Sequence, residues 1–349
     1  ELEDLGVSIG AYANNDYIKI SLKSTKEDFD KAFEILADII KNPAFEEKYI
    51  QKNKEDILAG IKKSRDVPMN VASEKFITTL YKNHPYGHTG AVVEKSMPTI
   101  TVKDVTDFWS QTFIPENMIV SAAGDINHQE LADRLAQTFP SSGNIPPALE
   151  SAKSTSSRIK LEQNNIVKTN SNSNAASILM GWPVGNIRDD KEMATFKVIN
   201  ALLSGGLSSR LHNTFREKQG LAYSVGASYT ASLDGGHFVL YIGTAPKNVE
   251  LVKAKFLEEI ERIKNQPLTQ AELEGIKSKI IGNYELAQET NESKAGIMGI
   301  YEVVDKKFGF NYDFPDLISK ITAEDIIRTA NKYFNDPYVL SIVAPSGEK

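Results

Sequence analysis

Apolar side chains recur at every third or fourth position in several long stretches of this chain. From 24 to 40 they fall on one face of a helix, and Pro43 then interrupts the pattern. Shorter apolar runs bounded by Gly, Asn or Pro are typical of strands. Helices are therefore predicted at 24–40, 46–63, 70–81, 101–113, 125–139, 191–203, 248–264 and 270–285. Two strands are predicted within 6–22, on either side of a turn at Asn14-Asn15. Further strands are predicted at 118–123, 178–182, 236–244 and 340–343, and one that begins at 223.

The order of these elements recurs in the second half of the chain. Equivalent positions are Pro43 and Pro267, Tyr49 and Leu273, Ile57 and Ile281, Thr101 and Thr322, Asp104 and Asp325, and Phe113 and Phe334. A repeat of this length predicts an α+β fold with two duplicated domains, each a mostly antiparallel sheet with helices packed on one face.

The predicted domains are 1–143 and 158–349, joined by a linker at 144–157 that is rich in Ser, Gly, Pro and Ala. The second copy opens with a strand and a helix that have no counterpart in the first copy. We therefore expect the first domain to be truncated at its N-terminus, with a segment of the protein preceding Glu1.

Composition narrows the possible functions only slightly. A length of 349 residues favours two domains. The net charge of -6 is modest and the basic residues form no stripe, so nucleic acid is not an expected partner. The sequence has no cysteine, which excludes disulfides and thiolate metal sites, and no apolar run approaches the ~20 residues that span a bilayer.

The most distinctive stretch reads GGLSSRL from Gly205 and REKQGLAYSV from Arg216. It predicts a Gly-Gly turn, a short polar helix and a strand that begins at Tyr223, with Gly220 supplying a positive φ between helix and strand. Arg216 and Tyr223 on one rim could grip a peptide carbonyl or stabilise an oxyanion. Spacing alone favours a structural interpretation, in which the arginine caps the helix and the tyrosine is half-buried.

The residues before Arg216 also have two interpretations. Gly205 and Gly206 allow either a close backbone approach to a substrate or partner, or a plain tight turn. Ser208 and Ser209 are expected to cap the short helix rather than act as nucleophiles, because no His–acid pair is recognisable beside them. All four are included as candidate substrate-binding residues.

These motifs make the chain similar to the insulinase/pitrilysin/mitochondrial processing peptidase family of zinc metallopeptidases over nearly its whole length. The stretch from 205 to 225 resembles the signature of the family's C-terminal domain. Three other sequences resemble the catalytic-type half: Pro43-x-Phe45, HPYG at 84–87 and AGD at 123–125. The resemblance implies that Arg216 and Tyr223 bind the substrate backbone and assist the tetrahedral intermediate.

The family's chemistry uses an inverted zinc motif, His-x-x-Glu-His, and a glutamate from a later helix. This sequence contains no such motif. His84 and His88 are four residues apart, but a proline and a glycine lie between them, so His84 is expected to anchor a turn. Alignment to the family places the third ligand and an auxiliary glutamate at Asn53 and Gly60, neither of which offers a carboxylate. We therefore expect this chain to bind no metal.

The leading hypothesis is a zinc-free, substrate-binding subunit or half of an insulinase-family peptidase, inactive alone. It would clamp an extended peptide or unfolded polypeptide and assist hydrolysis by a homologous zinc-bearing partner, or self-associate. Zinc is expected in that partner or in a segment upstream of Glu1. By resemblance, the bacterial cell envelope is the favoured compartment.

Two alternatives remain open at the level of sequence. The chain could be an active zinc endopeptidase whose His-x-x-Glu-His segment lies upstream, with Glu47 or Glu55 as an unusual third ligand. It could also be a structural or interaction subunit with no proteolytic role, although the presence of both Arg216 and Tyr223 argues against this.

Overall fold

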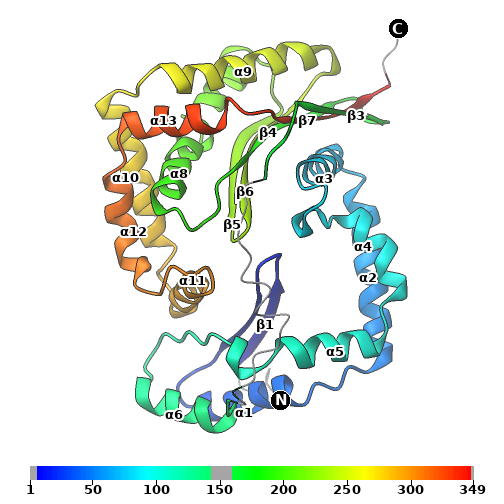
Figure 1. The fold of residues 1–349 in the computed structure, drawn as a ribbon, viewed down its shortest axis with the longest axis vertical. Helices are drawn as coiled ribbons and strands as arrows, with labels where there is room; N and C mark the ends of the chain where they lie inside the picture. Colours follow the sequence, from blue (N-terminus) through cyan, green and yellow to red (C-terminus); the bar gives the residue numbers. More distant parts are fainter. Residues whose placement is uncertain (1–5, 142, 144–158, 347–349) are drawn as a thin grey trace. The chain divides into compact units, whose positions relative to one another are not determined.

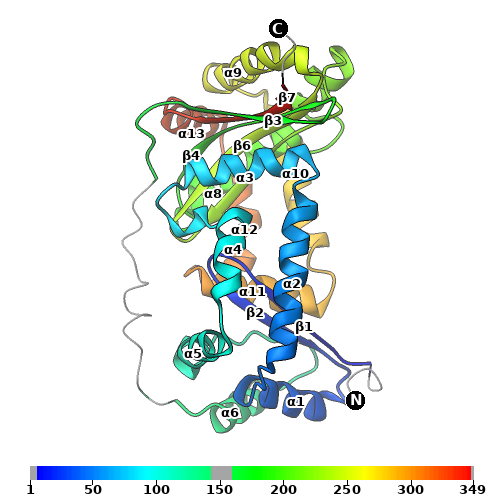
Figure 2. The same ribbon diagram turned by 90° about the vertical axis from the view of Figure 1, so that its right-hand side faces the viewer.

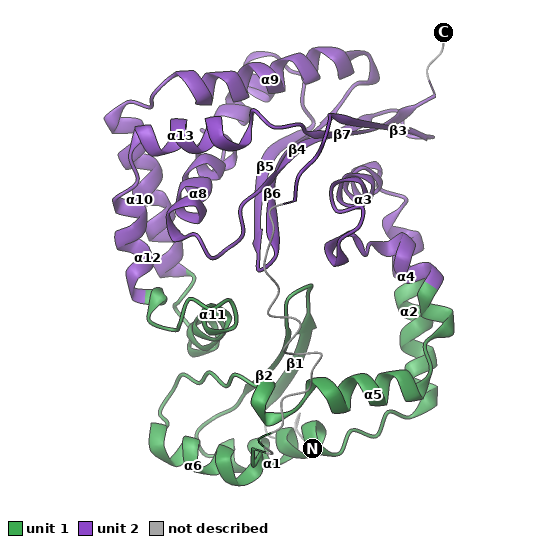
Figure 3. Ribbon diagram, in the orientation of Figure 1, with its two compact units in different colours: residues 1–58, 96–155, 287–311 green, residues 59–95, 156–286, 312–349 purple. Residues whose placement is uncertain are grey.

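The structure is a computed structural model that describes residues 6–141, 143 and 159–346. It forms two compact units, shown in different colours in Figure 3. The first unit comprises residues 1–58, 96–155 and 287–311, and the second comprises 59–95, 156–286 and 312–349. The predicted linker at 144–157 lies outside the described residues, so the domain limits of 1–143 and 158–349 stay a prediction.

The first unit contains a strand pair and several helices (Figure 1). Strands β1 (Ser8–Ala13) and β2 (Ile18–Lys23) are antiparallel, and the side-chain oxygen of Asn14 closes their turn by accepting hydrogen bonds from the backbone of Asp16 and Tyr17. The strand pair predicted around Asn14-Asn15 is therefore confirmed. The helices are α1 (Phe29–Lys41), most of α2 (Glu47–Ser64), α5 (Val102–Thr112), α6 (His128–Thr138) and α11 (Asn291–Val303).

The buried strand predicted at 118–123 is not present. Ile119 and Val120 are 47% and 55% exposed and lie in irregular backbone. Within the described part of the first unit, β1 and β2 pair only with each other, so this apolar run has no strand beside it to bond with. An apolar sequence alone does not make a strand without such a ladder.

Two helices begin later than the apolar pattern predicts. The helix predicted from 24 begins at Phe29. The helix predicted to open at Asp125 begins at His128, because the side chain of Asn127 caps it by accepting hydrogen bonds from two backbone N–H groups of the first turn.

The second unit is built on a five-stranded sheet with the order β3-β7-β4-β6-β5. Only the β3–β7 pair is parallel, which confirms a mostly antiparallel α+β fold. The strands are β3 (Asn165–Ser171), β4 (Ala176–Val184), β5 (Ser224–Ser232), β6 (Gly235–Thr244) and β7 (Val339–Pro345). The helices are α3 (Pro68–Leu80), α4 (Gly90–Ser96), α8 (Asp190–Ser204), the π-helix His212–Lys218, α9 (Val249–Asn265), α10 (Gln270–Leu286), α12 (Phe310–Ser319) and α13 (Ala323–Tyr333).

Helices from the second half of the chain cover one face of this sheet. Phe196 on α8 packs against Phe238 on β6, and Trp182 on β4 packs against Phe334 at the end of α13, with ring centroids 5.9 and 5.1 Å apart. Trp182, Phe196 and Phe238 are at most 1% exposed. These aromatic contacts form the centre of the core on that face.

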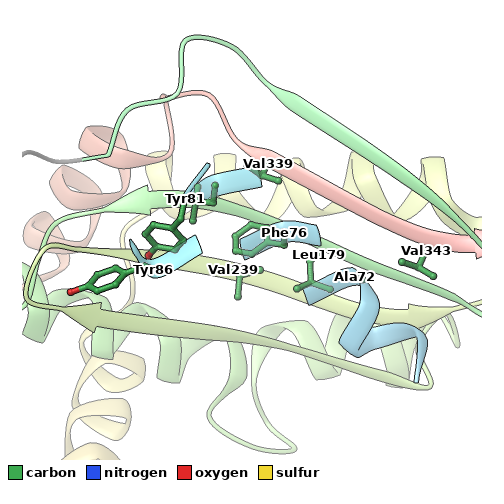
Figure 4. Close-up of a cluster of buried hydrophobic side chains, with 9 residues drawn as sticks. Ala72, Phe76, Tyr81, Tyr86, Leu179, Val239, Val339 and Val343 are labelled. Atoms are coloured by element: carbon green, nitrogen blue, oxygen red, sulfur yellow. The ribbon is translucent and has the colours of Figure 1, made fainter. Parts of the chain in front are cut away.

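The opposite face is covered by α3, which comes from the first half of the chain (Figures 1 and 2). Figure 4 shows Phe76 of α3 over Leu179, Val239 and Val339, which belong to three neighbouring strands. Gly181 provides the space, since a Cβ at that position would lie 2.7 Å from the Phe76 ring. At the centre of the sheet, β4, β6 and β7 are thus buried on both faces.

The repeat predicted from the sequence is visible in the caps of two helices. Thr101 and Asp104 form a capping box at the start of α5, and Thr322 and Asp325 form the same box at the start of α13. Helices α3 and α11 also occupy equivalent places in the repeat, since each end of α11 lies 223 residues after the matching end of α3.

These two equivalent helices are exchanged between the units. Helix α3, from the first half of the chain, packs in the second unit, and α11, from the second half, packs in the first. In the first unit, Glu292 of α11 pairs with Lys23 of β2 at 3.7 Å, and a Cβ on Gly299 would touch Ser121. Each compact unit therefore contains a helix from the other half of the sequence.

Candidate functional site

The candidate site begins where α8 ends, at the Gly-Gly turn. The backbone N–H of Gly205 bonds to the carbonyl of Ala201 at 2.8 Å, and a Cβ on Gly205 would clash with that same carbonyl. Gly206 follows with φ +124, a conformation that L side chains rarely adopt. A tight turn is therefore one reason for both glycines.

A π-helix over His212–Lys218 follows this turn and carries Arg216. Leu211 and Phe215 are fully buried, and the Phe215 ring packs against Phe256 of α9 at 5.2 Å. Single turns of π-helix are rare and are often found at functional sites. Here the wide turn keeps Phe215 in the core while Arg216, the next residue, is exposed.

The chain then turns back on the π-helix and enters β5. Gly220 has φ +60 and donates its N–H to the Arg216 carbonyl at 3.2 Å, while the N–H of Leu221 bonds to the Phe215 carbonyl at 2.7 Å. The backbone N–H of Tyr223 bonds to the carbonyl of Gly243 on β6 at 2.9 Å. These bonds fix the stretch from 216 to 223 as a continuous rim at the start of β5.

The side chains of Arg216 and Tyr223, at the two ends of this rim, face solvent. The side chain of Tyr223 is 68% exposed, and Arg216 is also exposed. Within the described residues, neither the Arg216 guanidinium nor the Tyr223 hydroxyl makes a hydrogen bond or ion pair. The donors of both groups are therefore available to a ligand.

Among the strands that the structure describes, β5 lies at the edge of the sheet and pairs with β6 alone. The outer backbone groups of an edge strand can bond to an added extended segment. Tyr223 immediately precedes this strand, so the exposed rim and the open edge are continuous along the chain.

The expected caps of the short helix are not formed by the two serines. The π-helix begins after Leu211 without a side-chain cap. Ser208 and Ser209 contribute their backbone carbonyls instead, which accept hydrogen bonds from the side chain and the backbone of Asn213, each at 3.0 Å. Ser208 is exposed and Ser209 is 8% exposed.

Arg210 carries a largely buried charge, and the spacing of the motif predicts no role for it. Its guanidinium lies 3.4 Å from a carboxylate oxygen of Glu259 on α9, and the two side chains are 13% and 7% exposed. Burial raises the pKa of Glu259, while the positive charges of Arg210 and Arg262 oppose the shift. The sequence offers one indication of this buried pair, because Glu259 lies directly before apolar Ile260 on the buried face of a predicted helix.

Comparisons with known proteins show the family of the chain. Residues 99–280 match the family described as peptidase M16 inactive domain, and residues 1–91 match the family described as insulinase (peptidase family M16). The chain belongs to the insulinase family of peptidases.

Individual relatives in the insulinase family match almost the whole chain. An uncharacterized zinc protease of Rickettsia bellii is 28% identical over 99% of this chain and 82% of its own length. The crystal structure of a peptidase M16 inactive domain from Pseudomonas fluorescens matches with a TM-score of 0.85 and 25% identity, over 100% of this chain and 83% of that one. A protease from Helicobacter pylori has the same fold, with a TM-score of 0.87 and 21% identity over 99% of this chain and 84% of that one.

Asn53 and Gly60, the residues predicted to stand at the metal positions of the family, offer no carboxylate to a zinc ion. Asn53 and Gly60 lie two turns apart on α2 and are both exposed, and nothing lies within 4 Å of where a Cβ on Gly60 would be. His84 anchors its turn as predicted, with Nδ1 accepting a hydrogen bond from the backbone of Tyr86 at 3.1 Å. Across 6–141, 143 and 159–346, no three His, Cys, Asp or Glu side chains are grouped as metal ligands.

None of the described helices is both long enough and apolar enough to cross a membrane.

Proposed function

We propose that this chain is the substrate-binding, zinc-free half of a two-part insulinase-family peptidase. It would bind an extended peptide beside a homologous half that carries the zinc. The match to an inactive-type domain and the absence of carboxylates at Asn53 and Gly60 support a chain without its own hydrolytic centre.

The observation that carries the proposal is the position of two exposed side chains, Arg216 and Tyr223, beside the edge strand β5. An extended peptide would add to β5 through backbone hydrogen bonds. The Arg216 guanidinium, a pure donor, would bind a peptide carbonyl, and the Tyr223 hydroxyl would donate to the oxygen on which charge develops. Both donors are already exposed on a rim fixed by backbone bonds, so little ordering is needed when peptide binds.

Two substitutions test the donors directly. With the chain paired to its zinc-bearing partner, Tyr223→Phe and Arg216→Ala should each lower turnover by roughly a hundredfold to a thousandfold, the usual loss for one oxyanion donor. Peptide cleavage rates measure this, and thermal unfolding checks that the variants stay folded.

Matched controls separate the proposed role from general surface effects. Tyr312 is as exposed as Tyr223, at 68%, so Tyr312→Phe should leave turnover unchanged. Lys218 is an exposed cation on the same π-helix, so Lys218→Ala tests whether positive charge alone matters. Wild-type turnover in both Arg216→Ala and Tyr223→Phe would refute the proposal and favour a structural subunit.

A further inference from the structure

The Gly-Gly turn of the candidate site is held by a lysine from a separate helix. Lys279 on α10 donates a hydrogen bond from Nζ to the carbonyl of Gly205. A Cβ on Gly206 would lie 2.9 Å from the same Nζ. Lys279 is exposed, and in the described part of the chain no carboxylate pairs with it. Among the described residues, its ammonium therefore bonds only to the turn.

The Lys279 ammonium binds at a favourable place for a cation. The Gly205 carbonyl follows the last turn of α8, where unpaired carbonyls and the helix dipole attract a cation. The turn itself contains two adjacent glycines, one of them at φ +124, and glycine has the greatest backbone freedom of any residue. A charged donor bound to the first glycine restricts a segment that would otherwise move easily.

Hydrogen bonds connect this turn to the π-helix. The N–H of Ser209 bonds to the Gly206 carbonyl at 2.9 Å, and the N–H of Asn213 bonds to the Ser209 carbonyl at 3.0 Å. The side chain of Asn213 also bonds to the Ser208 carbonyl at 3.0 Å. A displacement of the turn is therefore passed to the first turn of the helix that carries Arg216.

We propose that Lys279 is a positioning residue for peptide binding. It fixes the Gly205–Gly206 turn, and thereby the π-helix, in the arrangement in which Arg216 meets a peptide carbonyl. Lys279 acts through the turn and does not itself contact the peptide. The inference rests on the proposed function, because it assigns to Lys279 the support of Arg216.

The affinity of the full chain for a labelled extended peptide tests this role, with fluorescence anisotropy as the measurement. Lys279→Met should weaken binding roughly tenfold, the lower end of the loss seen when a group that orients a metal ligand is removed. Lys279→Arg keeps a charged donor and should bind within about twofold of wild type. Lys247→Met, at an exposed lysine just before α9, should not change the affinity.

Two further measurements distinguish positioning from general loss of stability. Hydrogen exchange should become faster at the amides of Ser209 and Asn213 in Lys279→Met but not in Lys247→Met. The double variant Arg216→Ala/Lys279→Met should bind peptide no more weakly than Arg216→Ala alone, because the lysine acts through the arginine. Full additivity of the two losses would overturn the proposal.

Peptide binding by the variants distinguishes failure of the Lys279 proposal from failure of the proposed function. If Arg216→Ala weakens peptide binding while Lys279→Met binds as wild type, only the role of Lys279 is refuted. Equal weakening by Lys279→Met and Lys279→Arg also refutes it. If Arg216→Ala itself binds peptide as wild type does, the proposed function fails and the role of Lys279 fails with it.

Discussion

Arg210 and Glu259 show how a motif residue can serve the site without touching a ligand. Both are largely buried, and together they attach the segment before the π-helix to α9. The sequence shows the GGLSSRL motif clearly but does not show which of its members bind ligand and which hold the backbone. Arg216 and Arg210 are six residues apart, and the structure separates them by burial, since Arg216 is exposed and Arg210 is largely buried.

Glu259→Gln should destabilise the chain strongly, because it leaves the Arg210 guanidinium buried without a compensating charge. We expect a loss of about 3 kcal/mol in the free energy of unfolding, measured with urea. The neighbouring Glu258 is the control, since it is 77% exposed and pairs with Lys255 at 3.7 Å. Glu258→Gln should cost less than about 1 kcal/mol. Equal losses for the two variants would contradict a buried-pair role.

At the scale of elements, the packing of α3 on the sheet involves a buried histidine. His237 of β6 shares a hydrogen bond of 2.9 Å with the hydroxyl of Tyr81, the residue that follows α3, and its ring packs edge-on against Phe76. Burial lowers the pKa of His237 to about 4. The histidine is therefore neutral in the folded chain at pH values where it is partly charged in the unfolded chain.

This shift predicts a dependence of stability on pH. The pKa of His237 in the folded chain lies below the unfolded value of about 6.5. The contribution of this shift to the free energy of unfolding is therefore fully present above pH 6.5 and is lost as the pH falls toward 4. Between pH 7.5 and pH 5 we expect a loss of about 2 kcal/mol in the free energy of unfolding. The variant His237→Gln should lack this part of the pH dependence. If the free energy of unfolding, measured with urea, falls equally with pH in wild type and in His237→Gln, the histidine is not the cause.

The sequence predicts individual elements better than their pairing. The capping boxes at Thr101 and Thr322 and the breaks at Pro43 and Pro267 are local signals, and each one marks a helix boundary region in the structure. The sequence does not indicate strand β3, because most of its residues are polar and its parallel partner, β7, is distant along the chain. The π-helix also has no local signature, since the buried residues Leu211 and Phe215 have the i, i+4 spacing of an ordinary helix.

At the scale of the whole molecule, the exchange of α3 and α11 could not be read from the sequence. The repeat predicts two similar domains, and it does not reveal that each unit takes one helix from the other half. The apolar positions of α3 only indicate a buried face. They carry no information about which sheet buries it.

The exchange predicts that the two halves of the sequence cannot fold separately. A fragment of residues 147–349 lacks α3, which leaves Leu179, Val239 and Val339 without their covering helix. Residues 1–146 lack α11 in the same way. Each fragment alone should show no cooperative thermal unfolding by circular dichroism, whereas the two produced together should co-purify and unfold cooperatively. Cooperative unfolding of either fragment alone would show that the exchanged helix is dispensable.

Strand β5 has a consequence for how the chain behaves in concentrated solution. A sheet edge that is open to one extended backbone is open to others, including the same edge of a second copy. If peptide binds at this edge as proposed, self-association and peptide binding would compete for one row of backbone amides and carbonyls. Saturation with a short peptide should therefore make the chain more soluble, because the peptide occupies the surface through which copies would otherwise stack.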